Sequence, residues 1–141
     1  MANRELVQLS KTYTDGIVSG MYMSSKLDGF RMVWDGGVSR GVPKVEVPWA
    51  NNDKDKRYKN PPIATGLWTR YGNVVHAPIW FLDQLPKGVI LDGEAWSPDL
   101  SRQDIRSTCG KLQPNSSEWS KIGFYVFNRL SPQVWLAVLG D

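Results

Sequence analysis

The sequence predicts an α+β fold in which a twisted, mostly antiparallel sheet carries a few short helices. Apolar residues alternate with small or polar ones on both sides of an Asp-Gly pair at 28–29, which is typical of two strands joined by a turn. Two later runs, 89–96 and 122–128, are rich in β-branched and aromatic residues, as strands are. The stretches with helical spacing, 78–85 and 99–109, are short.

Composition is that of one globular domain. With 141 residues, 41% hydrophobic and 22% charged, the chain is long enough for one core but not for two. Seven tryptophans either pack in that core or stack on bases. The net charge of +3 is compatible with a polyanionic partner. One cysteine excludes an internal disulfide. No apolar run reaches the length of a bilayer span or forms a signal core, so we expect a cytoplasmic protein with no membrane partner.

The first third of the chain is predicted to hold a helix and a hairpin. Residues 3–13 have the spacing of a short helix with a narrow apolar face. Residues 21–23 and 32–34 alternate as two strands, with Asp28-Gly29 as the turn between them. A second turn is predicted at 35–37, where the sequence is Asp-Gly-Gly.

Residues 41–62 are predicted to form a long polar loop, because they contain four prolines and a run of charges. Two interpretations are open: a solvated excursion, or a surface whose basic residues contact DNA phosphates beside Tyr58. Asp53 and Asp55 dilute the charge, which favours the first. The DNA-contact candidates are Lys54, Lys56, Arg57 and Lys59.

The remaining elements are indicated by turn and breaker residues. Pro78 can start a short helix that Pro86 ends, and Gly110 can end the helix of 99–109. A strand over 63–70, turned by 71–73, precedes them.

Lys26 and the strand 89–96 carry the chemistry. A lysine amine is a nucleophile only when it is neutral, and a nearby cation such as Arg31 favours the neutral form. With period two, Asp92 and Glu94 point to one side of their strand, where they are costly to bury unless paired or bound to metal. Cys109 and His76 are expected to be structural, and no zinc constellation exists.

Lys26-Leu27-Asp28-Gly29-Phe30-Arg31 resembles the Lys-x-Asp-Gly-x-Arg signature that opens the adenylation domain of ATP-dependent DNA ligases. Three further stretches occur in that family's order. Residues 69–73 are similar to its Ser-Arg-x-Gly motif, 91–96 to Leu-Asp-Gly-Glu, and 124–128 to an aromatic strand that usually ends Phe-Asp. The link 76–81 is similar to small viral, phage and bacterial ligases in particular.

The resemblance implies the first half of a nucleotidyltransferase, an ATP-grasp-like ligase domain, that uses ATP and Mg²⁺. Its partner would be nicked double-stranded DNA, it would be a monomer if complete, and it would work in the host-cell cytoplasm if viral or phage. Lys26 would attack the α-phosphate of ATP and carry AMP. The implied ATP-binding residues are Ser24 at the adenine edge, Arg31 and Arg70 at ribose or phosphate, Glu94 at ribose or metal, and Phe127 at the base, with Asp28, Gly29, Asp92 and Gly93 supporting them.

The chain departs from the family after the aromatic strand. The family's Glu-Gly and Lys-x-Lys motifs and its OB-type domain are not found, so we expect residues 1–141 to be a partial adenylation domain with slow self-adenylylation and no strand sealing. Asn128 replaces the usual aspartate, and Ala95 stands where leucine is common. An RNA ligase or capping-type enzyme, and a non-catalytic nucleic-acid-binding remnant, are the alternatives.

Overall fold

A computed structural model describes residues 17–19 and 28–133, which form a five-stranded sheet with short helices. The strands lie in the order β1-β5-β4-β2-β3, and every neighbouring pair is antiparallel except β1 and β5. The elements are β1 (Ile17–Ser19), β2 (Phe30–Asp35), the 3₁₀ helix η1 (Lys44–Glu46), β3 (Leu67–Trp68), α1 (Ile79–Leu82), β4 (Ile90–Trp96), α2 (Arg102–Gly110), α3 (Ser116–Trp119) and β5 (Gly123–Leu130). The predicted α+β class with a mostly antiparallel sheet is confirmed.

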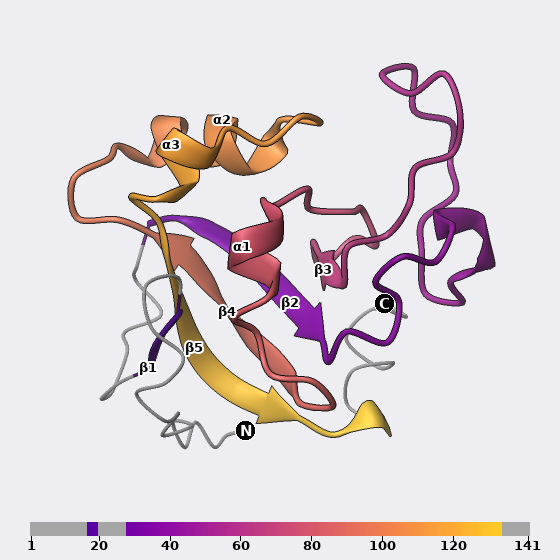
Figure 1. Cartoon of the computed structure of the whole chain (residues 1–141), viewed down its shortest axis with the longest axis horizontal. Helices are drawn as coiled ribbons and strands as arrows, with labels where there is room; N and C mark the ends of the chain where they lie inside the picture. Colours follow the sequence, from indigo (N-terminus) through magenta and orange to yellow (C-terminus); the bar gives the residue numbers. More distant parts are fainter. Residues whose placement is uncertain (1–16, 20–27, 134–141) are drawn as a thin grey trace.

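The three α-helices lie on one side of the sheet (Figure 1). Alternation along the strands turns Met32 and Trp34 of β2 and Leu91 of β4 to this side, where each is at most 1% exposed. Phe81 of α1 and Trp119 of α3 pack against them, and their own rings meet edge-on with centroids 4.8 Å apart. This main core occupies one face of the sheet and leaves the opposite face for other contacts.

A second apolar cluster covers one end of that opposite face. Val33 and Trp68, paired between β2 and β3, pack with Val47 and Ala64 from the segment that joins these strands. Val47 is 4% exposed, so part of the 41–62 loop is anchored in the core. The interpretation of this loop as a purely solvated excursion is therefore wrong at its N-terminal part.

Helix and strand bounds differ from the sequence-based ones where caps decide them. Helix α2 begins at Arg102 because the Ser101 side chain accepts a hydrogen bond from the Asp104 amide at 3.0 Å. Helix α1 is shorter than 78–85, and Pro78 is its N-cap rather than its first residue. The strands predicted at 89–96 and 122–128 match β4 and β5 closely. Sequence patterns missed β1, η1 and α3, each of three or four residues.

The two predicted glycine turns have different outcomes. Gly36 and Gly37 have φ of 83° and 85°, so the turn after β2 is confirmed. Gly29 does not take the left-handed φ that a two-residue Asp-Gly hairpin turn needs, so a turn of that type at 28–29 is wrong, and among the described strands those that pair with β2 are β3 and β4. The predicted helix at 3–13 and strand at 21–23 lie outside the described residues.

Candidate nucleotide-binding site

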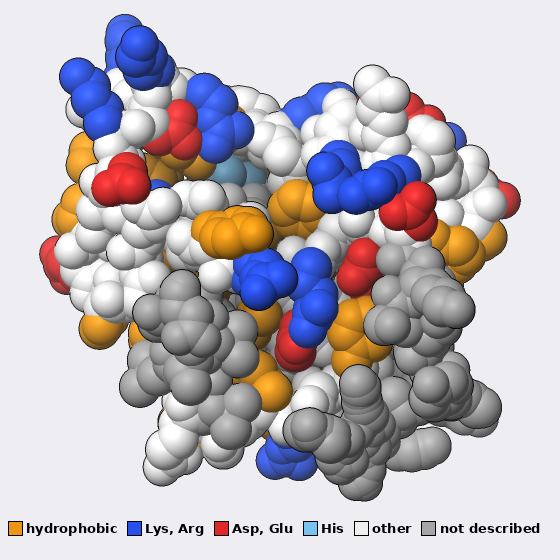
Figure 2. All heavy atoms as spheres, turned by 180° about the vertical axis from the view of Figure 1, so that it is seen from behind, with side chains coloured by type: hydrophobic (Ala, Val, Ile, Leu, Met, Phe, Trp, Pro, Cys, Tyr) orange, Lys and Arg blue, Asp and Glu red, His pale blue; other side chains and the backbone are white. Residues whose placement is uncertain are grey.

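Three central strands place charged and aromatic side chains on the face of the sheet opposite the helices, which we call the polar face. Arg31 of β2 is opposite Glu94 of β4, and Glu94 is opposite Tyr125 of β5. Side chains directly opposite one another share a face, and Asp92 shares it with Glu94 by period two, as the sequence predicted. Figure 2 shows acidic and basic side chains next to one another near the centre of this side of the molecule.

The centre of the polar face is an ion pair between Arg31 and Asp92. Arg31 Nε and Nη2 donate to the two carboxylate oxygens of Asp92 at 2.7 and 2.6 Å, a bidentate arrangement. The Asp92 side chain is 10% exposed and that of Arg31 is 48% exposed. The hydrogen bonds to Asp92 raise the pKa of Arg31, so the guanidinium is fixed in place and charged.

Phe127 shares the polar face with Tyr125 by period two, and it lies at a β-bulge. Asp92 pairs with Asn128 and Gly93 pairs with Val126, so Phe127 is the extra residue on β5. The Arg31 guanidinium carbon lies 5.2 Å from the centroid of its ring, within cation–π distance. A flat apolar ring therefore lies beside the arginine on the polar face.

Glu94 ties β4 to the start of β2. Its Oε2 accepts a hydrogen bond from the Gly29 amide at 2.9 Å, and the residue is 9% exposed. Burial raises the pKa of the Glu94 carboxyl, although the Gly29 amide and the Arg31 charge both favour its ionised form. The poorly solvated Glu94 carboxyl group is therefore hydrogen-bonded to the Gly29 amide. Gly29 lies three positions after Lys26 in the sequence.

Close packing explains both glycines of the two motifs. A Cβ at Gly29 would collide with the carbonyl oxygen of Ala95, and one at Gly93 with that of Tyr125. These carbonyls belong to neighbouring strands, so neither can move without disturbing the ladder. The glycines therefore let the site strands approach, which is a structural role.

Asp28 forms an ion pair of its own with a helix residue. Its Oδ1 lies 3.2 Å from Nε of Arg102, the first residue of α2, and both side chains are more than half exposed. Sequence reasoning missed Arg102, because no local pattern relates a helix start to a distant Asp-Gly pair.

The other predicted site residues make no polar contact with this cluster that the structure describes, or lie outside the described residues. Arg70 comes after β3, and its guanidinium lies 5.6 Å from the Tyr71 ring. Among residues 17–19 and 28–133, Arg70 has no hydrogen bond or ion pair with Arg31 or Glu94. Ser24 and Lys26 lie outside the described residues. The basic candidates of the loop, Lys54, Lys56, Arg57 and Lys59, lie on the segment between η1 and β3.

The polar face could supply only a small number of protein ligands to a metal ion. The described part of the chain has no group of three or more His, Cys, Asp or Glu side chains placed to hold an ion. Both oxygens of Asp92 accept from Arg31, whereas Oε1 of Glu94 receives no hydrogen bond from the described residues. Mg²⁺ in nucleotide sites is often held by one or two carboxylates and the substrate's phosphates, so Glu94 fits that role.

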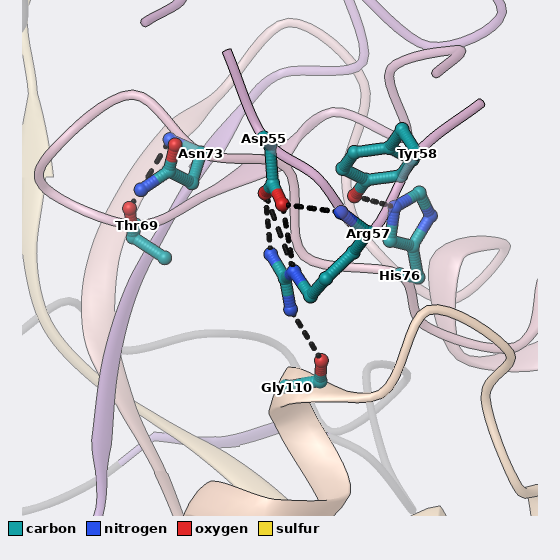
Figure 3. A network of polar contacts seen from close by, with 7 residues as sticks. All are labelled: Asp55, Arg57, Tyr58, Thr69, Asn73, His76 and Gly110. Atoms are coloured by element: carbon teal, nitrogen blue, oxygen red, sulfur yellow. Dashed lines mark hydrogen bonds and ion pairs between the residues drawn. The ribbon is translucent and has the colours of Figure 1, made fainter. Parts of the chain in front are cut away.

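Cys109 and His76 have structural environments, as expected. Cys109 is 2% exposed, and burial raises the pKa of its thiol, which makes a nucleophilic role unfavourable. His76 Nε2 lies 2.8 Å from the Tyr58 hydroxyl (Figure 3), and burial lowers the pKa of the imidazole.

Comparison of the chain with models of protein families, with curated proteins and with solved structures found no significant match in any of the three. Within the described ranges, none of the helices has the length and hydropathy that a bilayer span requires.

Proposed function

We propose that this chain is an adenylation module of an ATP-dependent DNA ligase, in which Lys26 takes AMP from ATP for the sealing of nicks. The observation that carries the proposal is the cluster of Arg31, Glu94 and Phe127 on three adjoining strands. All three residues belong to motifs that sequence similarity alone assigned to nucleotide binding, and Phe127 is the one on the aromatic strand. Their convergence on one face supports a common ligand.

The side chains match the parts of an adenine nucleotide. Phe127 offers a half-buried flat ring for a purine. Asp92 occupies Nε and one Nη2 hydrogen of Arg31, and the described residues supply no hydrogen-bond acceptor to Nη1, which remains for a phosphate or ribose oxygen. Glu94 Oε1 serves a ribose hydroxyl or Mg²⁺.

The proposed reaction is a single displacement at phosphorus. The neutral amine of Lys26 attacks the α-phosphorus of ATP, a P–N bond forms, the bond to the pyrophosphate oxygen breaks, and the amine loses a proton. Lys26 precedes Gly29 by three residues, and a segment of that length spans at most about 11 Å. The charge of Arg31 stabilises negative charge that develops during the transfer.

Transfer of label from ATP tests the proposal. We expect the protein to become labelled slowly by α-³²P-ATP with Mg²⁺ and not by γ-³²P-ATP, since pyrophosphate leaves. Lys26→Ala abolishes the label, and Phe127→Ala and Glu94→Gln reduce it. Lys121→Ala, which removes an exposed lysine before β5, leaves it unchanged. Absence of label, or label that survives Lys26→Ala, contradicts the proposal.

The nature of the nucleic acid is a separate part of the proposal. Labelled protein should transfer AMP to the 5′-phosphate of nicked duplex DNA in preference to an RNA end. Preference for RNA would favour the RNA ligase alternative. DNA binding without any transfer of AMP would favour the non-catalytic remnant.

A further inference from the structure

The 41–62 loop encloses a pocket of about 470 Å³ at the side of the sheet, which we call the lysine pocket. Four lysines and two aspartates contribute to its wall, and apolar residues form part of the rest. Basic side chains gather on the projecting loop at the upper left of Figure 2, on the same side of the molecule as the polar face. The charged residues are Lys44, Asp53, Lys54, Asp55, Lys56 and Lys59.

Lys44 is built into the wall rather than lying on the surface. It is the first residue of η1 and is 6% exposed. Its backbone amide donates to the Pro62 carbonyl at 2.9 Å, which closes the two ends of the loop on one another. Its side chain has no hydrogen bond or ion pair with any residue that the structure describes. Burial lowers the pKa of this amine, while the charges of Asp55 and Asp53 act in the opposite direction without forming an ion pair with it.

One of the two acidic side chains is already neutralised. Arg57 binds Asp55 through Nη2 at 2.8 Å and through Nε at 3.1 and 3.3 Å, and this pairing lowers the pKa of Asp55 to about 2. Figure 3 shows the same guanidinium donating to the Gly110 carbonyl, at 3.4 Å. Arg57 is therefore committed to the loop's own structure, which weakens the case for it as a DNA contact. Asp53 forms no ion pair with any residue that the structure describes, although its charge acts on the nearby Lys44 amine.

A second contact joins the 41–62 loop to the rest of the domain. The Tyr58 hydroxyl meets His76 Nε2 at 2.8 Å, and the Arg57 guanidinium lies 5.7 Å from the Tyr58 ring. These contacts fix the segment that carries the lysines to the body of the domain. A fixed cationic pocket loses little entropy when it takes an anion.

We infer that the lysine pocket binds a phosphate group of a nucleic-acid backbone, with Lys44 as its buried anchor. The three exposed lysines around it extend the positive charge along the loop, which suits a chain of phosphates better than a single free anion. Val45, 56% exposed, and Pro61 supply apolar surface for the sugars. This site deepens the proposed function by adding a contact to its nucleic-acid partner, but it does not require adenylylation.

Fluorescence anisotropy with a labelled nicked duplex tests this inference. Lys44→Met keeps the packed stem and removes the charge, and we expect it to weaken binding roughly tenfold. It should also lower the slope of log affinity against log salt by about one. Lys59 is exposed, so Lys59→Met does not disturb packing. This variant should also lower the slope of log affinity against log salt. Lys121→Met is the matched control and should change affinity by less than about twofold.

Equal effects of Lys44→Met and Lys121→Met would overturn the inference, as would failure of the unaltered protein to bind the duplex at low salt. Free phosphate is the alternative ligand. It would be assigned to the pocket by two results together: inorganic phosphate, at constant ionic strength, protects the Lys44 amine from chemical modification, and Lys44→Met loses no affinity for DNA. Labelling by ATP is measured in parallel. If Lys44→Met weakens DNA binding while no variant takes up AMP, the inference stands and the proposed function fails.

Discussion

Removal of the Arg31 guanidinium should destabilise the domain far more than removal of the comparable Arg102 guanidinium. Arg31→Met keeps a linear side chain but leaves the Asp92 carboxylate, 10% exposed, without its two charged hydrogen bonds. Arg102→Met breaks an ion pair with Asp28 whose side chains are 53% and 66% exposed. The two variants delete the same chemical group in different surroundings.

The expected size of each effect depends on these exposures. Breaking a buried pair costs about 3–5 kcal/mol, because the remaining charge is stranded. Water reaches the half-exposed Arg31 side of the ion pair. The expected loss in free energy of unfolding for Arg31→Met is therefore smaller, about 2 kcal/mol, which corresponds to a fall in Tm of about 8 °C. Exposed pairs contribute about 0–1 kcal/mol, so Arg102→Met should lower Tm by about 4 °C at most.

Thermal and urea unfolding followed by tryptophan fluorescence measures both variants. The double variant Arg31→Met with Asp92→Leu removes the stranded charge, so it should recover more than half of the stability lost in the single variant. Equal melting of Arg31→Met and Arg102→Met, or a double variant no better than Arg31→Met, would refute the argument that Asp92 depends on Arg31.

Three further predictions concern the site and the loop. Gly29→Ala should lower the free energy of unfolding in urea by about 3 kcal/mol, because its Cβ would collide with the Ala95 carbonyl. Gly110→Ala is the control and should not destabilise, because nothing lies within 4 Å of its Cβ. Equal losses in the two variants would contradict this. Because burial raises the pKa of Glu94 above its unfolded value of 4.5, the native state holds its proton longer and stability falls as pH rises through the raised pKa. Glu94→Gln should therefore melt above the unaltered protein near neutral pH, with a gap that closes on acidification below the unfolded pKa; a gap independent of pH would count against it. Tyr58→Phe removes the contact with His76 and should cost about 1 kcal/mol in the same unfolding assay, and no change would show that the loop is held elsewhere.

The sequence predicted the elements whose signals are local. The alternation in 89–96 gives the common face of Asp92 and Glu94, and Asp-Gly-Gly gives the left-handed turn at Gly36 and Gly37. Tryptophans could have been core or base-stacking residues, and Trp34, Trp68 and Trp119 are at most 1% exposed, which makes them core.

The features that the sequence could not predict depend on pairing between distant segments. The bidentate partner of Arg31 is set by the β2–β4 register, and the pairing of Asn128 with Asp92 is set by a bulge at Phe127 that no composition rule marks. Gly29 resembles a turn glycine, but the approach of β4 determines its role. The burial of Lys44 could not be predicted, because a lysine in a polar loop gives no sequence signal of burial. Only the nearby Val45 and Val47 indicate that this turn packs against the domain.

Peptide mass spectrometry after incubation with ATP and Mg²⁺ tests the central claim most directly. We predict one AMP on the peptide that contains Lys26, and a lower yield when Glu94 or Phe127 of the polar face is substituted. AMP on a different lysine, or no modified peptide after prolonged incubation, would contradict it.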